Sequence, residues 1–128
     1  MDLVVTQLVI AHLVGDFMLQ TAAMADRKYR PGWIGLLWCT VHVCIYTVVL
    51  VGPFGSQVSL LLVIGIFVPH WLVDRYSLSY RWMQLIGRSS LLADSSPTKV
   101  AFGVIIYVVI DQTFHLVSLV VLFIFLKP

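Results

Sequence analysis

The sequence predicts an all-α, polytopic membrane protein: a four-transmembrane-helix bundle with a polar His/Asp centre. Hydrophobic residues make up 60% of the 128 positions and charged residues only 11%, about half the charged fraction of a soluble domain. The apolar residues form four long runs, and the basic residues gather between those runs, as is usual for a chain in a bilayer. We expect residues 1–128 to form a single transmembrane domain.

The four predicted helices have the length that a membrane requires. A helix needs about 20 mainly apolar residues to cross ~30 Å of hydrocarbon, and a helix satisfies its own backbone polar groups there. The first run is not expected to be a cleaved signal peptide, because Asp2 is the only charge before it and no small-residue cleavage site follows. The runs cover about residues 3–23, 33–51, 58–78 and 100–126.

The connections between these runs differ in character. Residues 27–32 are basic and end in Pro-Gly, whereas residues 52–56 form a short uncharged turn. The third connection is longer, and Ser96 with Pro97 near its end suits the start of a helix. Within it, residues 80–92 mix apolar and basic side chains. That stretch suits either a segment lying on the lipid surface or an ordinary polar loop.

Basic residues also predict the orientation of the chain. The first and third connections hold seven of the eight Lys and Arg residues, and Lys127 is the eighth. The positive-inside rule places these two connections in the cytoplasm and both termini outside. With a net charge of +2 and no basic stripe, nucleic acid is not an expected partner. The expected partner is membrane lipid.

Each predicted helix carries one histidine, and three of these have an aspartate at helical spacing. A separation of four residues places both side chains on one helix face. By the predicted directions of the helices, the histidines fall near mid-membrane and the aspartates on their cytoplasmic side. An unpaired Asp at that depth costs roughly 2.5–3.5 kcal/mol on insertion scales, so such residues normally face the bundle interior. The pairs are His12 with Asp16, His70 with Asp74, and Asp111 with His115, and His42 stands alone.

This pattern predicts a divalent metal site. Imidazole and carboxylate ligands favour zinc, with manganese or iron as alternatives, over a soft Cu(I) site. Seven residues are candidate metal ligands: His12, Asp16, His42, His70, Asp74, Asp111 and His115. Because seven exceeds the four ligands of one tetrahedral zinc, either two ions bind or some residues orient ligands and act as a base. Asp16, Asp74 and Asp111 are the candidate catalytic residues. A structural hydrogen-bond network or a proton path remains an alternative.

Two further features concern packing. Ala11 and Gly15 form a small-x-x-x-small step beside His12, which predicts close packing of the first helix on a neighbour. Cys39 and Cys44 are five residues apart in one apolar run, so they lie on different helix faces and a disulfide between them is implausible. Cys39 is more easily explained as a buried apolar residue than as a ligand.

The run His12-Leu-Val-Gly15-Asp16-Phe-Met-Leu-Gln20, together with His42, His70-x-x-x-Asp74 and Asp111-Gln112-x-x-His115, resembles a known family across essentially the whole chain. This is the group of small bacterial and phage membrane proteins termed domain of unknown function 3307. More loosely, the pattern is similar to membrane-bound metal-dependent hydrolases. These resemblances imply the bacterial inner membrane and a hydrolytic reaction.

The leading hypothesis is therefore a membrane-embedded metal-dependent hydrolase acting on a lipid or lipid-linked substrate. No H-E-x-x-H motif is present, and the chain has no Glu to serve as its base. One alternative is a metal-ion or proton transporter or channel, because ionisable residues in mid-membrane often mark such paths; four helices would then have to form a homo-oligomer. A structural membrane subunit is the other alternative.

Overall fold

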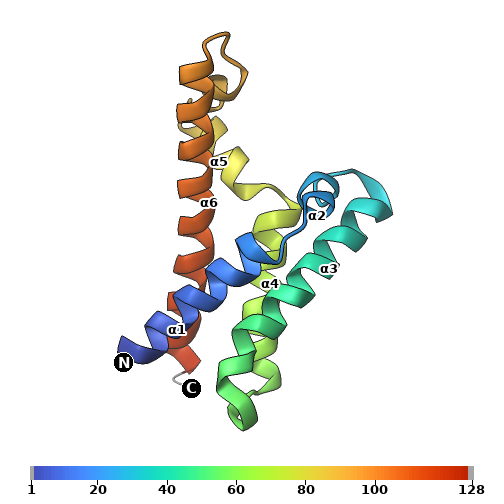
Figure 1. Ribbon diagram of the computed structural model, residues 1–128, viewed down its shortest axis with the longest axis vertical. Helices are drawn as coiled ribbons and strands as arrows, with labels where there is room; N and C mark the ends of the chain where they lie inside the picture. Colours follow the sequence, from blue (N-terminus) through green and yellow to red (C-terminus); the bar gives the residue numbers. More distant parts are fainter. Residues whose placement is uncertain (1, 127–128) are drawn as a thin grey trace.

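The computed structural model describes residues 2–126, and these residues form helices and short connections without a strand. Figure 1 shows the helices crossing one another at open angles. Along the chain they are α1 (Asp2–Leu13), η1 (Val14–Met18), α2 (Ala22–Arg27), α3 (Gly32–Val51), η2 (Gly52–Gln57), α4 (Leu60–Arg75), α5 (Leu78–Leu85), η3 (Ser89–Ala93) and α6 (Pro97–Leu126). The all-α prediction is confirmed for these residues.

The first apolar run is shorter as a helix than the sequence predicted. α1 continues into η1, a π-helical turn, and the helix then stops at Met18. A new helix, α2, begins behind Thr21, whose hydroxyl accepts a hydrogen bond from the Met24 amide at 3.3 Å. The prediction of one helix over residues 3–23 is therefore wrong at its end, because this cap starts a second helix.

The second apolar run matches its prediction closely. α3 begins directly after Pro31, whose fixed φ and missing N–H suit a helix start. It gives way at Gly52 to the 3₁₀ turn η2, where Gly55 has a positive φ of 51°, a conformation that glycine adopts readily.

The third apolar run is bent. α4 starts behind Ser59, whose hydroxyl accepts a hydrogen bond from the Leu62 amide at 3.1 Å, and it ends at Arg75 rather than at residue 78. Ser77 adopts a left-handed conformation with φ 48°, and α5 leaves at 55° to α4. Residues 80–92, for which the sequence allowed either a segment on the lipid surface or a polar loop, thus begin within the helix α5. In this helix Leu85 is exposed and Met83 is buried.

The last helix is the longest of the described residues. α6 has 30 residues and starts at Pro97, three residues before the predicted start at 100. The Asp94 carboxylate accepts a hydrogen bond from the Ser96 amide at 2.9 Å just ahead of it. α5 and η3 lie along the N-terminal half of α6, where Leu91 of η3 meets Gly103 so closely that a Cβ there would lie 2.9 Å from the Leu91 Cβ.

The number of candidate membrane spans is two or three. Residues 32–57 and 97–125 are long and apolar enough to cross a bilayer, and the bent pair α4 and α5 is a third if it forms one span. The apolar helix of residues 5–18 is shorter. Four spans are therefore not evident from length alone. Lys127, the one basic residue beyond the two basic connections, lies outside the described residues.

A compact apolar core holds the helices together at one end of the molecule. Gly15 of η1 packs directly on α3, because a Cβ there would lie 2.9 Å from Tyr46 Cδ2 and 3.3 Å from Tyr46 Cα. This confirms the close approach predicted from Ala11 and Gly15. In Figure 1 the start of α1, the end of α6 and the α3–α4 turn lie at this end. The core residues are Leu8, Ala11, Tyr46, Leu50, Leu62, Ile66 and Leu119.

Candidate metal centre

The expected polar cluster is present beside this core. α1, η1, α3, α4 and α6 bring their His and Asp side chains together, and all but one are almost fully buried. The buried members are His12, Asp16, His42, His70, Asp74 and His115. Asp111 is the partly exposed member, with 17% of its side chain accessible.

Two histidines lie at the centre of the cluster. The Nε2 atoms of His42 on α3 and His70 on α4 face each other at 3.2 Å, so at most one of them carries a proton there. Asp16 Oδ1 lies 3.3 Å from His42 Nε2 and 3.7 Å from His70 Nε2. Three potential ligand atoms from three helices thus form a triangle with sides of 3.2, 3.3 and 3.7 Å.

Asp74 forms a second triangle on the same pair of histidines. Its Oδ2 lies 3.3 Å from His42 Nε2 and 3.5 Å from His70 Nε2. Ligands of a tetrahedral zinc ion, bonded at about 2.0–2.1 Å, are separated by about 3.3–3.4 Å. Both triangles therefore have the size of one face of such a tetrahedron, and they share the edge between His42 and His70.

His115 is held as a further potential ligand. Its Nδ1 donates to the backbone carbonyl of Asp111 at 2.8 Å, which leaves the lone pair on Nε2, the arrangement typical of a metal-binding imidazole. His115 Nε2 lies 4.0 Å from Asp74 Oδ1. Both atoms are buried acceptors without a hydrogen-bond partner. Two buried acceptors that face each other fit a cation and would repel without one.

A buried lysine completes the charge of the centre. Lys28, in the connection after α2, places its ammonium 2.9 Å from Asp74 Oδ2, and both side chains are almost inaccessible. Burial alone would lower the pKa of this ammonium, but the Asp74 carboxylate outweighs burial and raises the pKa above its ordinary value. Lys28 therefore carries a charge inside the cluster and not at the surface of a loop.

His12 takes part through hydrogen bonds at both of its ring nitrogens. Nε2 donates to Gln112 Oε1 at 2.7 Å, so Nδ1 accepts from the Tyr46 hydroxyl at 2.8 Å. The Gln112 amide in turn donates to Asp16 Oδ2 at 2.9 Å. This chain of three bonds fixes one oxygen of Asp16 and leaves the other, Oδ1, facing the two central histidines.

Asp111 lies at the margin of the cluster. Its Oδ1 accepts a hydrogen bond from the Ser79 hydroxyl of α5 at 2.6 Å, and its Oδ2 lies 3.7 Å from His115 Nδ1. The two carboxylates nearest the central histidines are those of Asp16 and Asp74, whereas Asp111 approaches His115.

Groups of ligand atoms within 4.8 Å of one another include six of the seven predicted ligands. They are Asp16 with His42 and His70, His70 with Asp74 and His115, and Asp16 with Asp111 and His115. His12, hydrogen-bonded at both ring nitrogens, is in none of these groups. The predicted pairing of His12 with Asp16 runs through Gln112, whereas the His70–Asp74 and Asp111–His115 pairs approach directly, at 3.5 and 3.7 Å.

The local backbone helps to place Asp16. The π-helical turn η1 contains both Gly15 and Asp16, and such turns occur frequently at functional sites. Gly15 lets this turn approach α3, and the adjacent carboxylate then reaches His42. The spacing of Ala11 and Gly15 predicts this close approach, but it does not predict the π-helical turn itself.

Three residues that contact the cluster were not identified as site residues from the sequence. Lys28 was counted only among the basic residues of a connection, and Ser79 lies just before residues 80–92, in a connection to which no site residue was assigned. Tyr46 offered a usable signal, since it lies four residues after His42 and so on the same helix face.

Taken together, the fold and the cluster define an all-helical protein with apolar candidate spans and a buried His/Asp centre that could hold a metal ion. The chain belongs to the family described as Protein of unknown function (DUF3307), whose model matches residues 4–127. No curated protein and no solved structure matches it, and the looser similarity to metal-dependent hydrolases is not found among these comparisons.

Proposed function

We propose that this protein is a membrane-embedded, metal-dependent hydrolase that acts on a lipid or lipid-linked substrate. The observation that carries the proposal is the pair of facing His42 and His70 Nε2 atoms, 3.2 Å apart, with a carboxylate oxygen of Asp16 or Asp74 completing each triangle. Their nitrogen and oxygen donors suit zinc, with manganese or iron as alternatives.

Each member of the centre has a role in this proposal. His42, His70, Asp16 and Asp74 hold the ion, and His115 is held ready as a further ligand. When bound, a divalent ion supplies Lewis-acid polarisation of the substrate and a nucleophile at neutral pH. Asp111, bonded to Ser79 and partly exposed, accepts a proton as general base.

The access to the centre favours an enzyme over a transporter or channel. On the side of the chain ends, the apolar core that includes Leu50, Leu62 and Leu119 closes the bundle. On the other side, the buried Lys28 and the partly exposed Asp111 lead towards α2 and α5. A transporter needs access from both faces, whereas a hydrolase needs access from only one.

We further propose that the chain crosses the bacterial inner membrane four times, with both termini outside the cytoplasm. In support, the start of α1 and the end of α6 lie at the same end of the molecule as the α3–α4 turn (Figure 1). The obliquely placed α1 with η1 then serves as the first span, and α4 as the third.

Cysteine labelling tests this topology. In a variant lacking Cys39 and Cys44, a membrane-impermeant maleimide added from outside should label a cysteine placed at Gly55 and miss one placed at Arg30, because the basic connections lie in the cytoplasm. Permeabilised cells, in which both positions should react, provide the control. If the cysteine at position 30 were labelled in intact cells and the cysteine at position 55 were not, the orientation would be refuted.

Metal content tests the centre itself. The protein purified in detergent should contain about one equivalent of metal, and His42→Ala and His70→Ala should each lose most of it, because each removes a ligand shared by both triangles. Cys39→Ala is the matched control: it removes a potential ligand one turn from His42 and should leave the metal content unchanged. Wild-type protein that takes up no zinc, manganese or iron after reconstitution would contradict the proposal.

Activity separates the enzyme from the conduit. Wild-type protein should hydrolyse a member of a panel of lipid phosphates and esters, and Asp111→Asn should lower kcat by about 10²–10⁴-fold while metal stays bound. Proteoliposomes of the same protein are tested in parallel for zinc and proton flux. Flux abolished by Asp111→Asn, with no substrate hydrolysed, would favour the transporter.

A further inference from the structure

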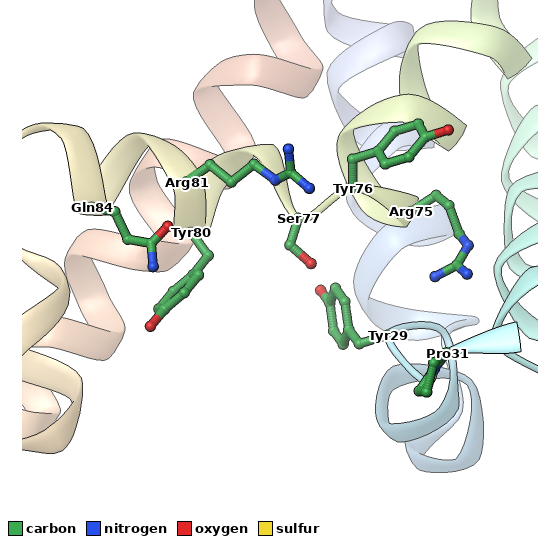
Figure 2. Close-up of a pocket in the computed structure, with 8 residues that line it drawn as sticks. All are labelled: Tyr29, Pro31, Arg75, Tyr76, Ser77, Tyr80, Arg81 and Gln84. Atoms are coloured by element: carbon green, nitrogen blue, oxygen red, sulfur yellow. The ribbon is translucent and has the colours of Figure 1, made fainter.

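A polar hollow lies at the junction of the two basic connections. It has a volume of about 460 Å³ and is bordered by Tyr29 from the first connection and by residues of the α4–α5 bend. Figure 2 shows Ser77 between Arg75 and Arg81, with the Tyr29 ring facing Ser77. Tyr80 of α5 also lines the hollow.

The charge of this hollow is positive. Arg75 and Arg81 line it, and no carboxylate does. Among the described residues, the one hydrogen bond of the Arg75 side chain is a long one of 3.5 Å to the Arg30 carbonyl, and the Arg81 side chain forms none within residues 2–126. Two guanidinium groups with free donors, beside tyrosine and serine hydroxyls, are suited to bind the oxygens of a phosphate.

The hollow adjoins the metal centre. Tyr29 directly follows Lys28, and Arg75 directly follows Asp74, so the Lys28–Asp74 ion pair of 2.9 Å links the two sides of the hollow. A ligand bound there would therefore contact the residues that directly follow Lys28 and Asp74 in the chain.

The surroundings suit an amphiphilic ligand. Next to Arg81, Trp82 is 47% exposed, and Leu85 on the same helix is 79% exposed. A basic pocket at the end of membrane helices, on the side rich in Lys and Arg, is a common site for anionic headgroups.

We infer that this hollow binds the phosphate group of a phosphorylated lipid through Arg75 and Arg81, and that this lipid is the substrate presented to the metal centre. The second half of this inference rests on the proposed hydrolase function. A free phosphate compound offers the same group without the acyl chains, and the experiment below separates the two sources.

The test measures binding, without turnover, to the full chain in a phosphate-free maltoside detergent. Dihexanoyl phosphatidate, a short-chain lipid phosphate, is titrated by calorimetry in the presence of a chelator. Arg81→Gln should weaken binding by about 10-fold or more, as loss of a charged hydrogen bond predicts, and Arg81→Lys should be intermediate because it keeps the charge but not the two-pronged geometry. Arg88→Gln, an exposed arginine of the same connection outside the hollow, is the matched control and should bind within about twofold of wild type.

Three results would overturn the inference. One is an equal loss of binding in Arg88→Gln and Arg81→Gln, which would indicate unspecific surface charge. Another is unchanged binding in Arg81→Gln. The third is inorganic phosphate binding as tightly as phosphatidate, which would assign the hollow to soluble phosphates. Because His70→Ala should still bind phosphatidate within about twofold of wild type, a failure of the metal proposal is distinguishable from a failure of this one.

Discussion

Replacing Lys28 by Met removes the buried ammonium that faces Asp74 while keeping most of the aliphatic volume. The side chains of Lys28 and Asp74 are 6% and 1% exposed, and their charged atoms lie 2.9 Å apart. Breaking a buried pair by removing one partner costs about 3–5 kcal/mol, because the remaining charge stays buried without compensation. We therefore expect the free energy of unfolding of Lys28→Met to fall by about this amount in the metal-free protein.

The assay is reversible unfolding in detergent, followed by circular dichroism, with and without metal. A divalent ion at Asp74 neutralises the same oxygen that Lys28 faces, so saturating zinc should stabilise Lys28→Met more than it stabilises wild type. The proposed centre therefore predicts that Lys28→Met loses much of its free energy of unfolding in chelator and regains most of that loss with zinc.

Lys99→Met is the matched control for this experiment. Lys99 lies 3.1 Å from Asp94 but is 61% exposed, and surface ion pairs contribute little. Its removal should not change stability measurably. If Lys28→Met in chelator were as stable as Lys99→Met, the account of Lys28 as a compensating charge would be refuted.

Two further predictions concern the support of the centre. Gly15→Ala should destabilise the protein by about 1–3 kcal/mol, because the new methyl would lie 3.3 Å from the Tyr46 Cα, which cannot rotate away. The control in thermal unfolding is Gly52→Ala, because no atom lies within 4 Å of a Cβ placed there. Equal losses of stability in the two variants would contradict the close packing of Gly15 on Tyr46. Tyr46→Phe removes the donor to His12 Nδ1 and should lower zinc affinity by about 10–100-fold in a chelator competition, whereas unchanged affinity would show that the bonds from Tyr46 through Gln112 do not hold Asp16.

Much of the centre could be predicted because helical spacing is a local property. A separation of four residues places Asp74 on the face of His70 whatever surrounds them. The cost of burying a charge in lipid then requires such faces to point inward. The side chains of His42, His70, Asp74 and His115 are buried as this argument requires.

What could not be predicted depends on contacts between distant segments. The end of η1 at Met18 and the left-handed Ser77 shorten two predicted helices, yet neither position carries a proline or glycine that would have announced a break. Lys28 reaches Asp74 across 46 positions of sequence, and a lysine in a basic connection is expected to face solvent. Its burial follows from how α2 folds back on α3, which composition does not encode.

Charge balance bears on how many ions the centre would hold. The cluster contains the carboxylates of Asp16, Asp74 and Asp111 and the ammonium of Lys28. With the imidazoles neutral, as ligands must be, these groups leave two negative charges in a region of low dielectric. A single divalent ion on the His42–His70 edge neutralises them, whereas a second ion would leave an equal excess of positive charge. The positive charge of Lys28 therefore reduces the negative charge that metal ions would have to neutralise. This favours one bound metal ion, with His115 and Asp111 as supporting groups.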